Sequence, residues 1–424
     1  MARFIINGRR KIGGAFQPAG NKNAVLPMLA ACLLTDEAIE LGNVPRIEDV
    51  TTMLAILTEL GVNVNQKERT VRLCARGVRK RRLSRELCHK VRSCILFAGP
   101  MAARHGRVVI YPPGGDVIGR RRLDSHLLGL RALGIEITGG EHFTFRRQTL
   151  RGADILLDEA SVTATENILM ATVLAPGATT LFNAACEPHV QDLGSLLMKM
   201  GARITGLGTN RLRVEGVESL HGAAHDVAPD HIETGSFLAA AAVTGGDLTI
   251  APVSRHAMAP ILRPFQTLGM ALTLDEGAIK LVARQRPRVR SELGLAVPKI
   301  EDGPWPNFPS DLMSVAIVAG TQAQGTVLFF EKMFESRMYF VDRLLDMGAR
   351  LVQCDPHRVV VIGPSSLRAI PVYSPDIRAG MALLIAALCA KGTSVINNAE
   401  VIDRGYERVE ERLRALGADI VRET

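Results

Sequence analysis

The stretch Pro112–Asp124 combines a carboxyl group, three consecutive arginines and a flexible backbone. The adjacent Gly114 and Gly115 allow the chain to bend sharply and to approach a ligand closely. The arginines that follow carry planar guanidinium groups, which suit phosphate or carboxylate. Asp116 lies between these features and is able to give or take a proton. The pattern indicates a loop that covers an anionic substrate, which we call the lid loop (112–125); the alternative is a polar hairpin with solvated arginines.

Five further polar signatures stand at or just before helices that the sequence predicts. They are Gly20-Asn-Lys22-Asn23, Lys90-Val-Arg92-Ser93, Pro229-Asp230 to Thr234, Phe308-Pro-Ser-Asp311, and a C-terminal set around Arg337, Asp376, Arg378 and Arg404. Any one of them could be a simple helix cap, and Asp311 has the residue type of an N-cap. Because helix N-termini attract anions, their recurrence predicts one anion-binding site built from several helix starts.

A repeat of about 70 residues organises the chain. Each copy reads as an apolar helix, a strand, an amphipathic helix that ends in Leu-Gly or Met-Gly, and another strand. The glycines of this signature are Gly61, Gly134, Gly201, Gly269, Gly348 and Gly417. Each is expected to adopt the left-handed conformation that ends a helix before a strand.

The apolar segments of the repeat predict which elements are buried. The expected apolar helices are 24–34, 95–103, 166–174, 235–243, 311–318 and 379–390, and the clearest strands are 107–111, 179–182, 247–250, 326–330 and 393–396. A unit of this size cannot bury both its faces alone, so six copies must pack together. We expect an α/β fold in which apolar helices are enclosed by sheets, with three repeats in each of two domains.

Composition limits the partners of the protein. The 424 residues carry a formal net charge of +8, which suits anionic ligands of several kinds. Aromatic residues make up only 4%, which argues against stacking on single-stranded nucleic acid. The basic run from Arg76 to Arg85 is expected to be a solvated loop and helix start.

Cysteine, histidine and hydropathy patterns predict a cytoplasmic protein with no metal. The seven cysteines form no Cys-x-x-Cys pair and read as reduced core thiols. His221 and His225 have helical spacing but no third ligand. The N-terminus lacks a signal-peptide core, and the longest apolar run, Ala379–Ala390, is too short to cross a bilayer.

Five motifs together make the chain resemble the enolpyruvyl transferases. They are Lys22-Asn23-Ala, Gly114-Gly115-x-Val-Ile-Gly119, Asp230-x-Ile-Glu-Thr, Phe308-Pro-x-Asp311 and Ile402-Asp-Arg-Gly-Tyr-Glu407. The resemblance extends from about Arg3 to Val421. It implies a two-domain inside-out α/β barrel. One domain would be 20–229 with the lid loop, the other 1–19 plus 230–424 with the catalytic base, and the active site would lie in the cleft between them.

The resemblance also implies a reaction. The 3-hydroxyl of UDP-N-acetylglucosamine would add to C2 of phosphoenolpyruvate, and the tetrahedral adduct would then release phosphate, as in peptidoglycan precursor synthesis. No metal, organic cofactor, membrane, nucleic acid or obligate protein partner is implied.

Residue roles follow from the same resemblance. The expected catalytic residues are Asp116 as proton donor, Asp311 as base on the attacking hydroxyl, and Lys22 and Arg404, which with Arg121 would hold phosphoenolpyruvate. Arg92, Arg337 and Arg378 would complete the cationic set, Asn23 would contact the sugar, and Asp230 and Glu187 would support the adduct. The remaining expected substrate contacts are Arg122, Leu123, Asp124, Ser125, Ser161, Val162, Thr163, Phe334 and Asp376.

Several residues depart from the family pattern. Most members have cysteine at the position of Asp116. A carboxylic acid can still protonate carbon when its protonated form is stabilised, but it is not the thiol that fosfomycin alkylates. The chain is therefore expected to be insensitive to fosfomycin. Arg122, His231, Thr163 and Glu159 replace the more usual Pro, Arg, Gly and, in some members, Lys.

The changes beside the expected nucleotide pocket leave alternatives open. One is the same chemistry on another nucleotide, such as UMP in secondary metabolism. Transfer to shikimate phosphate fits the lid loop and Asp124 poorly. A nucleic-acid-binding protein and a catalytically inactive relative are disfavoured by the retained Lys22, Asp311 and Arg404.

Overall fold

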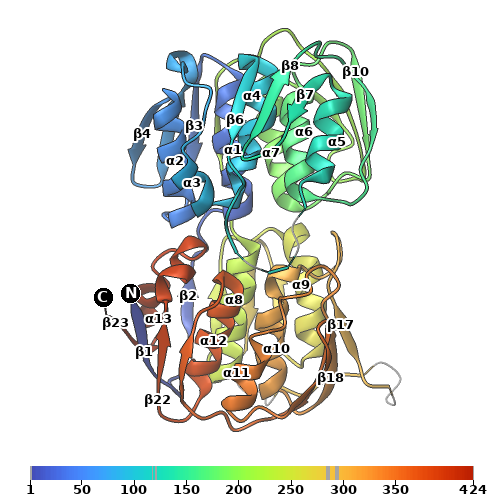
Figure 1. Cartoon of the computed structure of the whole chain (residues 1–424). Coiled ribbons are helices and arrows are strands. Elements are labelled where there is room, and N and C mark those ends of the chain that lie inside the picture. The colour runs from blue at the N-terminus through green and yellow to red at the C-terminus, as the bar shows by residue number, and fades with distance from the viewer. Residues whose placement is uncertain (1, 117, 120–121, 283–286, 292–295, 424) are drawn as a thin grey trace. The chain divides into compact units, whose positions relative to one another are not determined.

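The computed structural model describes residues 2–116, 118–119, 122–282, 287–291 and 296–423 (Figure 1). The chain divides into two compact units. Unit 1 comprises Met1–Ala19, Val117–Arg120 and Pro229–Thr424, and unit 2 comprises Gly20–Asp116 and Arg121–Ala228. Each unit has its own hydrophobic core.

Three sheets belong to unit 2. The first has the order β13 (Ala223–Asp226), β3 (Ala38–Gly42), β5 (Thr70–Cys74), β4 (Asn63–Lys67). The second is β6 (Arg107–Ile110), β8 (Phe143–Arg147), β7 (Ile135–Thr138). The third is β11 (Arg203–Thr205), β12 (Arg211–Glu215), β10 (Ala178–Phe182), β9 (Asp154–Leu156).

The helices of unit 2 follow the expected alternation. The apolar ones are α1 (Lys22–Ala31, continued by the 3-10 turn η1, Cys32–Leu34), α4 (Ala98–His105, preceded by η3, Arg92–Phe97) and α6 (Val162–Thr172). The others are α2 (Glu48–Leu60), α3 (Arg85–Lys90), α5 (Asp124–Ala132), α7 (Pro188–Lys199) and the turn η2 (Ala75–Gly77). Helix α6 packs against both α1 and α4, so the apolar helices lie inside.

Unit 1 repeats this plan. Its sheets are β15 (Leu272–Asp275), β16 (Ala278–Leu281), β14 (Leu248–Ile250), β2 (Gly14–Phe16); β17 (Lys299–Glu301), β18 (Gly325–Phe330), β20 (Arg358–Gly363), β19 (Leu351–Asp355); and β21 (Pro371–Tyr373), β22 (Thr393–Asn397), β1 (Arg3–Asn7), β23 (Asp419–Glu423). The apolar helices α8 (His231–Thr244), α10 (Met313–Gln322) and α12 (Ile377–Cys389) pack against one another (Figure 1). The outer helices are α9 (Arg255–Thr267), α11 (Val341–Asp346) and α13 (Val409–Ala415), and η5 (Ser310–Leu312) and η6 (Ala399–Arg404) are 3-10 turns.

Six glycines confirm the predicted repeat. All six glycines of the Leu-Gly or Met-Gly signature have φ between 86° and 103°, the left-handed conformation that only glycine adopts freely. Each of these glycines follows the end of a helix and precedes the next strand. The six-repeat prediction of an α/β fold with enclosed helices is therefore correct. Within the described residues no sheet closes on itself as a barrel.

Strands from distant parts of the chain complete sheets in both units. In unit 2, β13 pairs in parallel with β3, so the end of the third repeat completes the sheet of the first. In unit 1, β1 lies between β22 and β23 and pairs antiparallel with both. These long-range pairings close each group of three repeats on itself.

Candidate functional site

Asp311 is held by two arginines from separate elements of unit 1. Its Oδ1 accepts a hydrogen bond from Arg337 at 2.9 Å, and its Oδ2 accepts one from Arg378 at 2.6 Å. The two arginine side chains are only 4% and 7% exposed, whereas the Asp311 side chain is 25% exposed. The idea that Asp311 is an N-cap is wrong, because neither η5 nor α10 has a side-chain cap. The ion pairs orient its carboxylate instead.

Arg378 is fixed at the start of α12. Asp376 caps this helix by accepting hydrogen bonds from the backbone N–H groups of Arg378 and Ala379. Arg378 also donates to the Tyr406 hydroxyl at 3.2 Å. Burial is the largest single effect and lowers the pKa of Arg378, but the charges of Asp311, Tyr406 and Asp230 together with the hydrogen bond to Asp311 outweigh it, so the pKa is raised overall. The guanidinium group therefore stays charged.

Arg337 is placed by a buried acid that the sequence analysis did not identify. Glu331 accepts hydrogen bonds from the backbone N–H groups of Met333 and Phe334 and lies 3.8 Å from Arg337 Nε. Its other contacts include the Ser310 hydroxyl, next to Asp311. Burial raises the pKa of Glu331. Phe334, an expected substrate contact, stacks under Arg337 at 5.1 Å.

Asp230 and its neighbours start α8. Asp230 caps the helix by accepting from the N–H groups of Ile232 and Glu233. His231 is fully buried, which lowers its pKa, and it lies within the electrostatic reach of Asp311 and Arg378. Unit 1 thus brings Asp230, Asp311 and Arg378 into one electrostatic group. Arg404 is half-buried at the end of η6.

Glu233 ties α8 to the N-terminal segment. Its carboxylate accepts from the Ala19 N–H at 2.7 Å and pairs with Arg412, whose guanidinium lies over the Phe16 ring. Burial raises the pKa of Glu233 to about 7. This pair was missed because its members are far apart in the sequence.

Glu233→Gln is expected to make the free energy of unfolding less dependent on pH. A carboxyl group whose pKa is raised on folding stabilises most below its ordinary pKa of 4.5, and this contribution is lost as the pH rises through about 7. The wild type should therefore lose about 3 kcal/mol relative to the variant between these limits. Denaturant titrations at several pH values test this, with the exposed Glu411→Gln as control. A difference in the free energy of unfolding between the wild type and Glu233→Gln that does not change with pH contradicts this expectation.

Lys22 is an expected catalytic cation in unit 2. It is the first residue of α1, and its amino group pairs with Asp49 at 2.7 Å. The two side chains are only 10% and 7% exposed. Asn21 caps the helix through the Ala24 N–H, and Asn23 is half-buried. Asp49 was missed because it reads as an ordinary acid at the start of α2.

Asp49→Asn is expected to destabilise the protein by about 3–5 kcal/mol, because it removes the negative partner of a buried Lys22. The KM for the anionic substrate should rise with it, since Lys22 loses a contact that orients it. Denaturant unfolding and steady-state kinetics test this. The neighbouring exposed Glu48→Gln is the control, and a variant as stable as wild type contradicts the expectation.

The start of the lid loop is packed on Arg92. Gly114 donates its N–H to the Cys88 carbonyl at 3.0 Å, and a Cβ on Gly114 would lie 1.8 Å from the His89 carbonyl oxygen. Gly115 has φ of 101°, and a Cβ there would lie 3.1 Å from Arg92. Asp116 follows and is half-buried. The glycines are thus required by close packing.

The rest of the lid loop is described in part. Arg92 donates to the Arg122 carbonyl at 3.2 Å, and Arg122 pairs with Asp124. The Ile118 carbonyl accepts from the Ser336 N–H at 3.3 Å, and Ile118 and Gly119 cluster with unit 1. Arg121, an expected phosphoenolpyruvate ligand, lies outside the described residues.

The expected nucleotide contacts lie at the starts of α5 and α6. Leu123 precedes α5, and Asp124 and the buried Ser125 are its first residues. Ser161 precedes α6, which begins with the half-buried Val162 and Thr163. Glu187 precedes α7, and burial together with the Glu187 charge raises the pKa of the fully buried Glu166.

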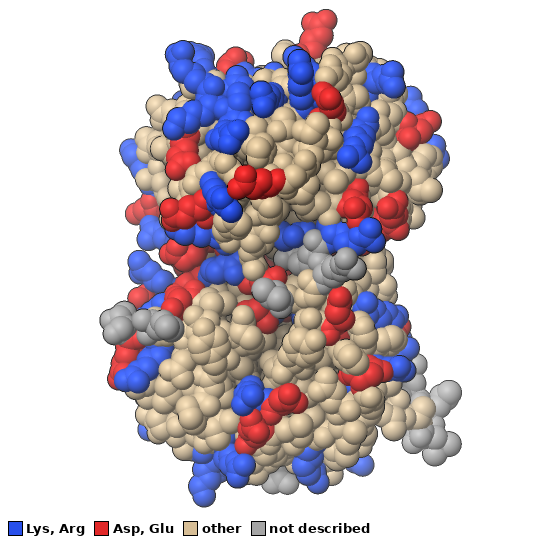
Figure 2. Space-filling model, in the orientation of Figure 1, with Lys and Arg blue, Asp and Glu red and all other residues tan. Residues whose placement is uncertain are grey.

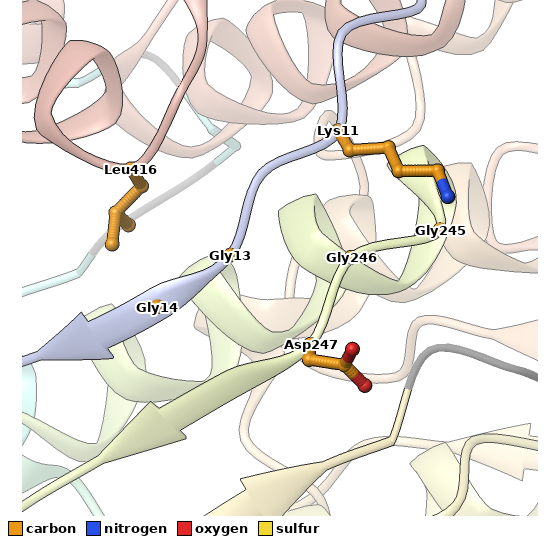
Figure 3. Close-up of a pocket in the computed structure, with 7 residues that line it drawn as sticks. All are labelled: Lys11, Gly13, Gly14, Gly245, Gly246, Asp247 and Leu416. Carbon is orange, nitrogen blue, oxygen red and sulfur yellow. The ribbon is translucent and has the colours of Figure 1, made fainter.

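The basic run Arg76–Arg85 and a surface pocket contain none of the expected site residues. Figure 2 shows Lys and Arg scattered with Asp and Glu over the visible face of each unit. The Arg76–Arg85 run is mostly exposed, as predicted, and Arg85 pairs with Glu141. A pocket between Lys11, Asp247 and Leu416 is lined mainly by glycine backbone and holds none of the expected site residues (Figure 3).

The seven cysteines are free, but Cys354 is exposed, so not all of them are core thiols as predicted. Across the described ranges no cluster of three potential metal-ligating side chains occurs. Over the same residues no helix combines the length and hydropathy needed to cross a membrane.

Comparisons with known proteins match this organisation over the whole chain. The EPSP synthase (3-phosphoshikimate 1-carboxyvinyltransferase) family model matches residues 6–413. UDP-N-acetylglucosamine 1-carboxyvinyltransferase of Bradyrhizobium diazoefficiens is 50% identical over 99% of this chain and 98% of its own. The protein of that name from Treponema pallidum is 49% identical over 100% of both chains.

Solved structures agree on the fold. The enolpyruvyl transferase NikO from Streptomyces tendae superposes with a TM-score of 0.88 at 22% identity, covering 100% of this chain and 99% of its own. EPSP synthase from Acinetobacter baumannii gives 0.78 at 18% identity, covering 100% of both chains. With the family model and the near-full-length relatives, these findings establish that the chain belongs to the EPSP synthase family of enolpyruvyl transferases.

Proposed function

We propose that the protein transfers the enolpyruvyl group of phosphoenolpyruvate to the 3-hydroxyl of UDP-N-acetylglucosamine and releases phosphate. The observation that carries the proposal is the Asp311 carboxylate, oriented by two buried arginines and still partly exposed. Relatives about half identical over the full chain bear the name of this activity. The acceptor follows from those relatives rather than from the fold.

The residues have distinct tasks in this reaction. Asp311 accepts the proton of the sugar hydroxyl, whose oxygen then bonds to C2 of phosphoenolpyruvate. Asp116 gives a proton to C3, so the double bond becomes a methyl group in the tetrahedral adduct. Loss of a proton from that methyl and departure of phosphate restore the double bond, which now belongs to the enolpyruvyl ether.

The cations bind and neutralise the substrates. Lys22, Arg92, Arg337 and Arg404 are suited to the carboxylate and phosphate of phosphoenolpyruvate, and stabilise negative charge as phosphate leaves. Buried cations act strongly because water does not screen them. Lys22 and Arg337 are both more than nine-tenths buried.

We also propose that the protein acts in the cytoplasm. The seven free thiols suit a reducing compartment.

Product analysis tests the proposal. Purified protein is incubated with phosphoenolpyruvate and UDP-N-acetylglucosamine, and the nucleotide product is examined by mass spectrometry and NMR. We expect a three-carbon enolpyruvyl ether on the sugar 3-oxygen. An unmodified UDP-N-acetylglucosamine beside a modified UMP in a parallel reaction would assign the protein to another nucleotide.

A further inference from the structure

Two buried acids lie side by side in unit 1, next to the arginine that contacts Asp311. Asp302 and Glu331 are both fully buried. We propose that they hold one proton between them, and that this acid pair is a positioning element that keeps Arg337 bonded to the Asp311 carboxylate. Its effect on turnover rests on the proposed function, whereas the shared proton is independent of it.

Strand pairing brings the two acids together. Strands β17 and β18 are parallel neighbours (Figure 1), and Glu301 at the end of β17 is in register with Phe330 at the end of β18. The next residue after each strand is an acid, so Asp302 and Glu331 lie at the same edge of the sheet. Their side chains are within hydrogen-bonding reach of each other.

The hydrogen bonds of Asp302 show where a proton is needed. Its Oδ1 accepts from the Lys332 N–H at 2.5 Å, but within the described residues its buried Oδ2 has no hydrogen-bond partner. A buried oxygen without a partner is costly. A protonated Glu331 carries an O–H group that can donate to this oxygen. One shared proton also avoids two ionised carboxylates in one buried site.

The environment of Glu331 agrees with one proton on the pair. Its Oε1 accepts from two backbone N–H groups of the turn that follows, each at 3.0 Å, and its Oε2 accepts from the Ser310 hydroxyl at 2.9 Å. Burial and the hydrogen bond with Asp302 raise the pKa of Glu331 to about 9, although the Arg337 charge lowers it. The pair therefore keeps its proton at neutral pH.

The proton on the pair decides which acid Arg337 contacts. Arg337 donates to Asp311 at 2.9 Å, whereas its Nε lies 3.8 Å from Glu331 Oε2, too far for a hydrogen bond. Within the part of the chain that the structure describes, the buried Nε and Nη1 of Arg337 have no hydrogen-bond partner. A second ionised carboxylate would attract these donors and compete with Asp311 for the guanidinium group. A neutral Glu331 leaves Arg337 on Asp311.

Charged and titratable groups from several elements face the pair. Arg337 exerts the largest charge effect on Glu331. His357 places Nδ1 2.7 Å from the backbone carbonyl oxygen of Glu331 and so contacts the main chain. The other groups are Asp311, which Arg337 and Arg378 contact, and Glu301, which pairs with Lys299 and Lys332. Arg337 is therefore the cation on which ionisation of the pair acts.

The pH profile of kcat tests the positioning role. In the wild type, kcat should fall about 10-fold for each pH unit above about 9, because the doubly ionised pair draws Arg337 away from Asp311. Glu331→Gln mimics the protonated form, since its amide can donate to Asp302, and should remove this fall. Asp302→Asn should move the fall to lower pH, because it removes a carboxylate that raises the pKa of Glu331.

Glu301→Gln is the matched control, because it removes the neighbouring acid of β17, which pairs with two lysines. This variant should keep the wild-type profile, and unfolding curves check that each variant is folded. A wild type without the alkaline fall overturns the positioning role. The same fall in all four proteins, as ionisation of the uracil ring of the substrate would give, also overturns it.

Infrared difference spectra test the shared proton without turnover. Raising the pH of the wild type from neutral to above about 9 should remove the band of a protonated carboxyl group, and Glu331→Gln should lack this component. Glu166 and Glu233, whose pKa values burial also raises, contribute equally to both proteins. A change of the same size in Glu331→Gln overturns the shared proton. If the wild type shows the additional component but transfers no enolpyruvyl group, the proposed function fails and the shared proton is supported.

Discussion

Asp311→Asn is expected to lower kcat by about 10²–10⁴-fold, the usual contribution of a general base. The asparagine side chain has almost the same size, but it cannot accept the proton of the attacking hydroxyl. In the wild type, Arg337 donates a hydrogen bond to one carboxylate oxygen of Asp311 and Arg378 donates to the other. In the variant, the amide N–H of the asparagine faces one of these two guanidinium groups. Both effects act on the chemical step, so the loss should appear in kcat more than in KM.

A matched control separates catalysis from general loss of an ion pair. Asp355 pairs with Arg358 at 2.7 Å at the surface of the same unit. Asp355→Asn should leave kcat unchanged. Phosphate release under saturating substrates measures both variants, and unfolding curves check that each is folded. If Asp311→Asn keeps the kcat of the wild type, Asp311 is not the base.

Asp116→Cys is expected to convert a fosfomycin-insensitive enzyme into one that the drug inactivates completely. A thiolate is alkylated by the epoxide, whereas the carboxyl group of Asp116 is a far weaker nucleophile. Position 116 is partly exposed, since Asp116 is only half-buried, and the preceding Gly115 packs against Arg92. The wild type should keep its activity after long incubation, and the variant should lose it with time.

The cysteines already present are an internal control for this experiment. Cys354 is exposed in both proteins, so non-specific alkylation would label it in both. Peptide mass spectrometry should find the adduct only at position 116 of the variant. A wild type that loses activity to fosfomycin, or a variant labelled only at Cys354, contradicts the account. Asp116→Asn should lose activity without the drug, because it removes the proton donor.

The fold could be predicted from the sequence because its signals are local and repeated. The left-handed glycine after each amphipathic helix is set by the conformation of one residue, and it recurs six times. Apolar helices such as α12 are recognisable because they are buried on every side. Each unit is a closed group of three such repeats, completed by strands that the sequence does not mark as partners.

Where the first turn of a helix is polar, the predicted helix begins several residues after the observed one. Residues 235–243 were expected, but α8 begins at His231, and α6 begins at Val162 instead of 166. Buried polar residues such as Glu233 and Thr165 look like loop residues to a hydropathy pattern. They are tolerated because their polar atoms are hydrogen-bonded across the unit. These polar first turns also contain residues of the candidate site.

The partners of the site residues could not be predicted. Asp49, Glu331 and Arg412 contact Lys22, Arg337 and Glu233 across 27, 6 and 179 residues of sequence, and no local pattern marks these pairs. The residues that bind or react were found through motifs, because their types are dictated by the chemistry. The residues that orient them are dictated by packing.

The measurement that tests the central claim most directly is phosphate release from phosphoenolpyruvate in four parallel reactions. UDP-N-acetylglucosamine or UMP is the acceptor, each with and without fosfomycin. We expect phosphate release with UDP-N-acetylglucosamine that persists in the presence of fosfomycin, and no release with UMP. Release with UMP alone would contradict the proposed acceptor, and the absence of release with either would contradict the proposed function while leaving the fold unchanged.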